Sequence, residues 1–162
     1  MALSATKLSS EHSTSRLYLK AHKEKKMAVN TKTGYALRAL IEIALQGQVS
    51  AQKISEAQNL PKKYIEHLLS LMREARLINS TAGIRGGYSL AKEPDEITFK
   101  NLLQAVGDES FATACHRGLK EYCIGTGCTL APFYTELEGK LNEIFDSYTL
   151  RDILNIWERK VS

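Results

Sequence analysis

Cysteine, proline and tryptophan are scarce in this chain, and each shortage excludes a class of protein. Its 162 residues include three cysteines, three prolines and one tryptophan. The cysteines all fall between residues 115 and 128, and an odd number without a secretory apolar segment argues against a disulfide framework and for a reducing compartment such as the cytoplasm. No apolar run approaches the ~20 residues of a membrane-spanning helix. The composition predicts a soluble protein with one domain and an assembly element.

Motifs of enzyme chemistry are also missing. Cys115 and His116 are neighbours, as a nucleophile and its base could be, but no oxyanion hole, substrate-pocket motif or phosphate-binding loop accompanies them. We therefore expect no enzyme activity.

Residues 1–27 differ in composition from the rest of the chain. The first 26 residues contain six Lys/Arg against two acidic residues and show little apolar periodicity. This composition is typical of a disordered appendage. We interpret the segment as a leader, tag or misplaced start, with a basic DNA-binding tail and a transit peptide as alternatives.

The stretch from Leu60 to Leu90 predicts a helix followed by a tight pair of strands. Pro61 suits a first helical turn, and apolar residues then recur at the i, i+3, i+4, i+7 spacing of a buried stripe. Glycines at 83, 86 and 87 allow the chain to reverse between two short extended runs. A short helix after Ser50, with Ile54 and Ala57 facing inward and Asn59 in the turn, precedes it. This order is typical of a winged helix-turn-helix.

Two further helices are predicted to complete this domain, which we place at residues 28–107. The first runs from a cap at Thr31 to Gln46 with Leu45 on its buried side, and Gly47 ends it. The other begins at the Thr98 cap and ends at Gly107. The expected fold class is mainly α, with a small β-hairpin wing and a long C-terminal dimerisation helix.

Charge is distributed unevenly along the chain. Residues 61–92 carry six Lys/Arg against two acidic residues, whereas residues 93–162 carry seven against twelve. A basic region of this kind favours phosphate binding, because each neutralised phosphate releases condensed counterion. The sequence therefore predicts a double-stranded DNA partner. The alternatives are a solvated helix that only aids solubility and a winged helix that binds another protein.

The predicted DNA contacts come from the outward side of the helix that begins at Pro61 and from the hairpin tip. Major-groove contacts are expected from Lys62, Lys63, Tyr64, Glu66, His67 and Ser70, and a backbone or minor-groove contact from Arg85.

Residues 130–162 change to a different apolar pattern. A strict seven-residue repeat, typical of a helix that packs along a partner helix, is formed by Leu130, Tyr134, Leu137, Leu141, Ile144 and Tyr148. Thr149 and Asp152 resemble a capping box for a last short helix that carries Leu150, Ile153, Leu154 and Trp157. We expect a second copy of the chain to cover these apolar groups. The alternative is a stripe that folds back on its own domain.

Residues 108–129 lack periodicity and hold Cys115, Cys123 and Cys128. Three thiols on a glycine-containing loop can converge on an iron–sulfur cluster or on zinc. We expect a cluster, because metal orders such a loop more naturally than apolar burial. Zinc completed by His116, a thiol switch and inert thiols remain alternatives, and Glu121 and Asp108 are weaker further ligands.

From about Val29 to Ile153 the sequence resembles the bacterial winged-helix regulator family that includes IscR, NsrR, RirA and CymR. The resemblance is carried by TKTGYALRALIEIA, ISEAQNLPKKYIEHLL, GIRGGYSLAKEPDEIT, the three-cysteine loop and SYTLRDIL. It implies a homodimeric transcription regulator that binds palindromic operators. In the cysteine-bearing branch it further implies an iron–sulfur cluster that senses iron, cluster status, nitric oxide or redox state.

The sequence departs from that family at four points. Many relatives have arginine before the first wing glycine, where this chain has Ala82, and Arg85 is the candidate to replace it. The spacing C-x7-C-x4-C is closer to the RirA-like arrangement than to the C-x5-C-x5-C of IscR. Ala131 and Gly34 stand where IscR-like members have a histidine ligand and NsrR-like members an acidic one. The fourth cluster ligand is therefore left open.

Overall fold

The computed structural model describes residues 30–83, 86–112 and 128–161, with the side chains of 160 and 161 excepted. Helices dominate these residues, together with one antiparallel hairpin, as expected from the sequence. The elements in chain order are α2 (Thr31–Gln46), α3 (Ala51–Gln58), α4 (Lys62–Glu74), β1 (Ile78–Thr81), β2 (Gly87–Leu90), the 3-10 helix η1 (Pro94–Glu96), α5 (Phe99–Val106), α6 (Ala131–Ser147) and α7 (Leu150–Val161). None of these helices is long and apolar enough to cross a membrane.

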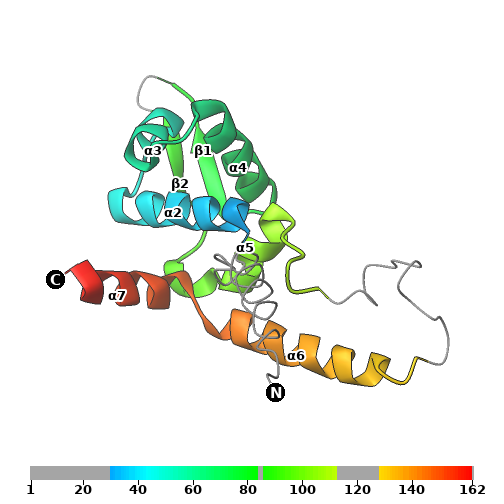
Figure 1. Ribbon diagram of the computed structural model, residues 1–162. Helices are drawn as coiled ribbons and strands as arrows, with labels where there is room; N and C mark the ends of the chain where they lie inside the picture. Colours follow the sequence, from blue (N-terminus) through cyan, green and yellow to red (C-terminus); the bar gives the residue numbers. More distant parts are fainter. Residues whose placement is uncertain (1–29, 84–85, 113–127, 162) are drawn as a thin grey trace, which may run out of the picture.

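One apolar core joins α2, α4 and α5. Its members include Leu40, Ile43, Ile65, Leu69 and Leu102, all almost inaccessible to solvent. Figure 1 shows α2 with α3, α4 and the hairpin on one side and α5 on the other. The stripe predicted for the 60–74 helix is confirmed, because all its apolar positions are buried.

The helix ends follow the expected capping chemistry with one correction. The caps at Ser50 and Thr98 and the left-handed ends at Asn59 and Gly107 are as predicted. The cap predicted at Thr31 is wrong: Asn30 accepts the N–H of Lys32 instead, and Thr31 is the first helical residue. An asparagine one residue earlier offers the same acceptor, so the sequence alone did not separate them.

Two predicted core positions are also wrong. Leu45 is 47% exposed, since it lies in the last turn of α2. Ala57 is exposed as well, and Ser55 is the buried neighbour of Ile54 in α3. Burial of Ser55 is tolerated because its hydroxyl donates to the carbonyl of Leu60 at 2.6 Å.

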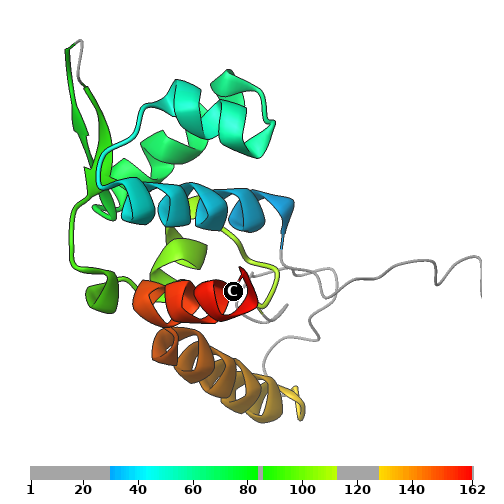
Figure 2. The same ribbon diagram turned by 90° about the vertical axis from the view of Figure 1, so that its left-hand side faces the viewer.

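The C-terminal helix α7 packs partly into the core of the winged helix-turn-helix domain. Leu150 and Leu154 are buried in the same core as α2 and α4, so these two apolar groups are covered by their own chain. Trp157, by contrast, is 42% exposed. Figure 2 shows α7 between α2 and α6, so that α6 forms the edge of the molecule farthest from α3.

Candidate nucleic-acid interface and cysteine segment

The N-terminal half of α4 presents polar side chains on the side opposite its buried stripe. Lys62, Lys63, Glu66 and His67 are exposed, and Lys62 Nζ lies 3.7 Å from a carboxylate oxygen of Glu66. Ser70 is partly buried and donates to Glu74. An ion pair between groups this exposed contributes little to stability. Both its members therefore stay available to a ligand.

Tyr64, a predicted major-groove contact, packs one side of its ring against α2. It is half-buried, and its ring packs edge-on against that of Tyr35 in α2, with centroids 6.1 Å apart and planes at 89°. The guanidinium of Arg38 lies 5.9 Å from the centre of the Tyr35 ring. Tyr35 was not among the residues predicted from the sequence for this site. Its signal would have been an aromatic residue beside, rather than on, the buried stripe of α2.

The wing is tied to the helix-turn-helix by a third extended segment. Val49 and Tyr88 exchange two backbone hydrogen bonds, of 3.0 and 2.8 Å, which add Val49, two residues before α3, to the hairpin. Gly87 lies so close to it that an added Cβ would be 2.8 Å from the Val49 carbonyl oxygen. Arg73 of α4 reaches Ser80 of β1 at 3.5 Å. The orientation of the wing is thus fixed by backbone pairing. Arg85, the predicted DNA contact in the wing, lies outside the described residues.

Of the three cysteines, only Cys128 is described. It is free and half-buried, and its carbonyl accepts the N–H of Ala131 at the start of α6. Cys115, Cys123, His116 and Glu121 lie outside the described residues. Within the described ranges no three His, Cys, Asp or Glu side chains gather in a way that could hold a metal ion.

Asp108, a weak ligand candidate from the sequence, is occupied by other partners. Its carboxylate accepts the Thr33 hydroxyl and both the N–H and the hydroxyl of Ser110. Partial burial raises the pKa of this carboxyl, but the hydrogen bonds from Ser110, Thr33 and the Asn30 backbone outweigh it and leave the pKa below its usual value.

The apolar residues of α6 divide between two directions. Leu141 and Phe145 face their own domain, where they help to line a cavity of about 300 Å³ against α5. There the Phe145 ring packs on Phe111 and Phe99, with centroids 4.8 and 5.8 Å away. The other large groups are exposed, namely Leu130, Phe133, Tyr134, Leu137, Ile144 and Tyr148. Folding back thus accounts for part of the stripe and leaves most of it uncovered.

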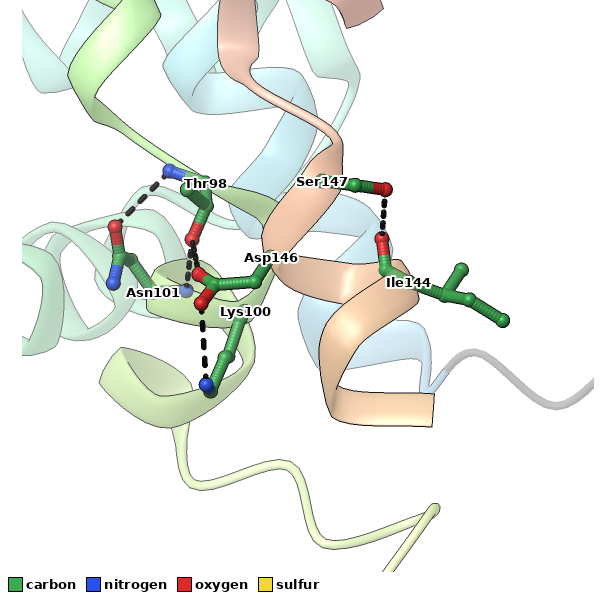
Figure 3. A network of polar contacts seen from close by, with 6 residues as sticks. All are labelled: Thr98, Lys100, Asn101, Ile144, Asp146 and Ser147. Atoms are coloured by element: carbon green, nitrogen blue, oxygen red, sulfur yellow. Dashed lines mark hydrogen bonds and ion pairs between the residues drawn. The ribbon is translucent and has the colours of Figure 1, made fainter. Parts of the chain in front are cut away.

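The C-terminal end of α6 is anchored to the start of α5. Asp146 accepts the Thr98 hydroxyl at 3.1 Å and the Lys100 ammonium at 3.3 Å, as Figure 3 shows. Beside them the Phe99 N–H donates to the Tyr148 carbonyl at 2.8 Å, and the Leu150 N–H to the Ile97 carbonyl at 2.7 Å. This end of α6 is therefore held by both side chains and backbone.

Comparison with known proteins identifies the family. The model of the Rrf2 family, described as iron-dependent transcriptional regulators, matches residues 29–156. The chain belongs to the Rrf2 family. The Rrf2 protein IscR of Aliivibrio salmonicida is 34% identical over 132 residues, which cover 79% of this chain and 77% of that one. An HTH-type regulator of Synechocystis is 35% identical over 130 residues, covering 78% and 87%.

Solved structures of Rrf2 regulators have the same fold. CymR of B. subtilis, described as the global cysteine regulator, superposes with a TM-score of 0.64 at 28% identity, covering 80% of this chain and 97% of that chain. IscR of T. potens gives 0.60 at 29% identity, covering 82% and 90%. This Rrf2 chain is therefore a DNA-binding transcription regulator with a winged helix, and its relatives are regulators, not enzymes.

Proposed function

We propose that this Rrf2 protein is a homodimeric repressor in the cytoplasm whose affinity for a palindromic operator is set by an iron–sulfur cluster. DNA reading is best supported by the two faces of α4. One face is completely buried, while the first two turns of the other expose Lys62, Lys63 and His67. A helix held this rigidly can enter a major groove without rearranging. The signal would be iron, cluster status, nitric oxide or redox state.

In this proposal α4 reads the major groove and the wing contacts the backbone or minor groove. Lys62, Lys63, Glu66, His67 and Ser70 would face the DNA, and Arg85 would contact it from the wing. Tyr64 would contribute mainly through its hydroxyl edge, because its ring packs on Tyr35. A phosphate contact adds affinity for every sequence, whereas a base contact specifies one position.

The test is to replace Lys63 by alanine and to measure binding to an operator duplex at several salt concentrations. The operator is the duplex recovered from a random library with the unmodified protein. We expect weaker binding and a smaller salt slope, because a phosphate contact is lost. Arg159→Ala, which removes one charge from an exposed position of α7, is the matched control. An unchanged affinity and salt slope for Lys63→Ala would remove α4 as the DNA-reading helix.

The dimer is proposed to form through the exposed face of α6. Phe133 is 59% exposed and Ile144 is 52% exposed, and single chains rarely leave such a run of large apolar groups on one helix uncovered. The seven-residue spacing of the exposed Leu130, Leu137 and Ile144 fits a second copy of the same helix. A two-fold axis would then set the two α4 helices in successive major grooves, about one DNA turn apart or a multiple of it.

Replacing Leu137 and Ile144 together by aspartate tests this interface. Sedimentation should show a monomer, and operator affinity should fall, because one α4 alone reads only a half-site. Glu143→Lys, a charge change at an exposed position of α6 outside the apolar stripe, should leave the dimer intact. If the double variant sediments like the unmodified chain, α6 is not the interface.

Cys115, Cys123 and Cys128 would hold the cluster. Thiolate sulfur is the ordinary ligand of iron–sulfur clusters, and Cys128 is a free thiol next to the first turn of α6. The family description as iron-dependent supports the same choice. The cluster would supply a redox-active centre, and its loss or oxidation would change the conformation of the cysteine-bearing segment 108–129. Coupling between two sites of a regulator is typically 1–3 kcal/mol, roughly 5- to 150-fold in affinity.

Anaerobic purification, visible absorbance and analysis of iron, sulfide and zinc test the cofactor. We expect iron and sulfide in the unmodified protein and their loss in each Cys→Ala variant. Stoichiometric zinc without sulfide would replace the cluster by a structural zinc site. A colourless, metal-free protein whose DNA affinity still changes on oxidation would instead establish a thiol switch.

A further inference from the structure

Asp108 joins two distant parts of the chain. It is the first residue after the left-handed Gly107 that ends α5, and its N–H donates to the Leu103 carbonyl at 2.9 Å. One carboxylate oxygen accepts the Thr33 hydroxyl of α2. The backbone of Asn30, the cap of α2, is a further donor to it. The residue that starts the cysteine-bearing segment is thereby fixed to the first turn of α2.

The buried Thr33 hydroxyl needs a hydrogen-bond acceptor, and Asp108 provides it. Thr33 is completely buried, although α2 carries mainly apolar residues on that side. A buried hydroxyl without a partner is costly, and here its partner is the charged oxygen of Asp108. The negative charge also lies at the N-terminal end of α2, where the helix dipole favours it. These effects together favour one position for the first turn of α2 relative to α5.

The first turns of α2 also contact α4, the proposed DNA-reading helix. Tyr35 lies two residues after Thr33 and packs edge-on against Tyr64, in the first turn of α4. Deeper in the contact, Ala36 and Ala39 of α2 share a close-packed core with Ile65 and Leu69 of α4. A packed core transmits a shift of one helix to its neighbour, since it offers little free volume to absorb it.

We propose that Asp108 is a positioning residue for DNA recognition, which acts through Thr33 and the Tyr35–Tyr64 pair to set the pose of α4. The inference rests on the proposed role of α4 as the DNA-reading helix. It deepens that role by naming a group that touches no DNA and yet governs specific binding. Because Asp108 begins the segment that carries the cysteines, it also provides a route from that segment to α4.

Ser110 supplies the control that separates this role from local turn formation. It donates its N–H and its hydroxyl to the other carboxylate oxygen of Asp108, at 2.9 and 2.5 Å, and among the described residues its hydrogen bonds do not reach α2. If Asp108 only shapes the turn after α5, losing the Ser110 hydroxyl should matter as much as losing that of Thr33. If Asp108 positions α2, only the Thr33 contact should affect DNA binding.

The experiment compares Thr33→Val, Thr33→Ser, Asp108→Asn and Ser110→Ala in the full chain. Each is assayed against the selected operator duplex and a scrambled duplex, well below the unfolding temperature. We expect Thr33→Val and Asp108→Asn to weaken operator binding about 5- to 20-fold and scrambled-duplex binding less than about twofold. Thr33→Ser and Ser110→Ala should bind the operator like the unmodified protein.

The double variant Thr33→Val/Asp108→Asn completes the test. Its operator affinity should equal that of the weaker single variant, because Thr33→Val already removes the hydroxyl whose bond to the charged Asp108 carboxylate the second change weakens. Additive losses, equal losses on both duplexes, or an unchanged affinity for Thr33→Val would overturn the inference. If Lys63→Ala lowers affinity and Thr33→Val does not, the role of α4 stands and only the role of Asp108 fails.

Discussion

Gly87→Ala should loosen the wing from the helix-turn-helix. The new Cβ would lie 2.8 Å from the carbonyl oxygen and 2.9 Å from the carbonyl carbon of Val49, and both are backbone atoms that cannot rotate away. To relieve this clash the two extended segments must separate, which breaks the two hydrogen bonds between Val49 and Tyr88. At roughly 1 kcal/mol for each bond, the loss is about 2 kcal/mol.

Urea denaturation measures this loss directly. With a slope of about 1.5 kcal/mol per molar urea, the midpoint should fall by roughly 1.3 M. Gly139→Ala is the matched control, because it is the same chemical change in a helix where the new Cβ meets no atom within 4 Å. That variant should gain roughly 0.5–1 kcal/mol from reduced backbone entropy. A Gly87→Ala midpoint equal to that of the unmodified protein would refute the close approach of Val49.

Three further perturbations test other parts of the fold by denaturation at fixed protein concentration. Arg76, two residues after the end of α4, has φ 57°, a conformation that costs a non-glycine residue about 1 kcal/mol. Arg76→Gly should therefore raise the free energy of unfolding by roughly 0.5–1 kcal/mol. A lower free energy of unfolding would contradict the backbone strain at Arg76. Leu154→Ala should lower the free energy of unfolding by about 2–4 kcal/mol, because the side chain is buried. Ile156→Ala, at a partly exposed position of the same helix, should lower it by less than about 1 kcal/mol. Equal losses for the two variants would contradict the packing of α7 into the core. Because the pKa of Asp108 is lower in the folded than in the unfolded chain, its carboxylate stabilises the fold above pH ~4 and this contribution is lost as the pH falls through the folded pKa. The stability difference between unmodified protein and Asp108→Asn should therefore be larger at pH 6 than at pH 3, and a difference independent of pH would contradict the lowered pKa.

Local patterns predicted most of the fold. The stripe of α4, the caps at Ser50 and Thr98 and the glycine end at Gly107 all involve residues within a few positions of each other, and all are confirmed. The error at Leu45 arose because periodicity predicts which side of a helix faces inward but not where its neighbours end.

Contacts between distant residues could not be read from the sequence. Thr33 and Asp108 are 75 positions apart, and a threonine on a buried face gives no sign of a charged partner. The same holds for Leu154 of α7, which was expected to be covered by a second copy of the chain and is instead buried in the core of its own chain. The candidate DNA face was accessible to sequence reasoning because it lies on one helix. Tyr64 was harder to place, since its packing depends on Tyr35 of another helix.

The two ends of α6 differ in how they are held, and this difference bears on how a signal could reach the DNA. The C-terminal end is fixed to α5 by Asp146 and by the backbone bonds around Tyr148. The N-terminal end follows Cys128 and carries the exposed Leu130 and Phe133. A change at the cysteine segment would therefore reach α6 at its N-terminal end, while the C-terminal end is anchored to the winged helix-turn-helix domain. In the proposed dimer, rotation about the Asp146 anchor would alter the separation of the two α4 helices, and the Asp108 contact would act on α4 from the other end of the same segment.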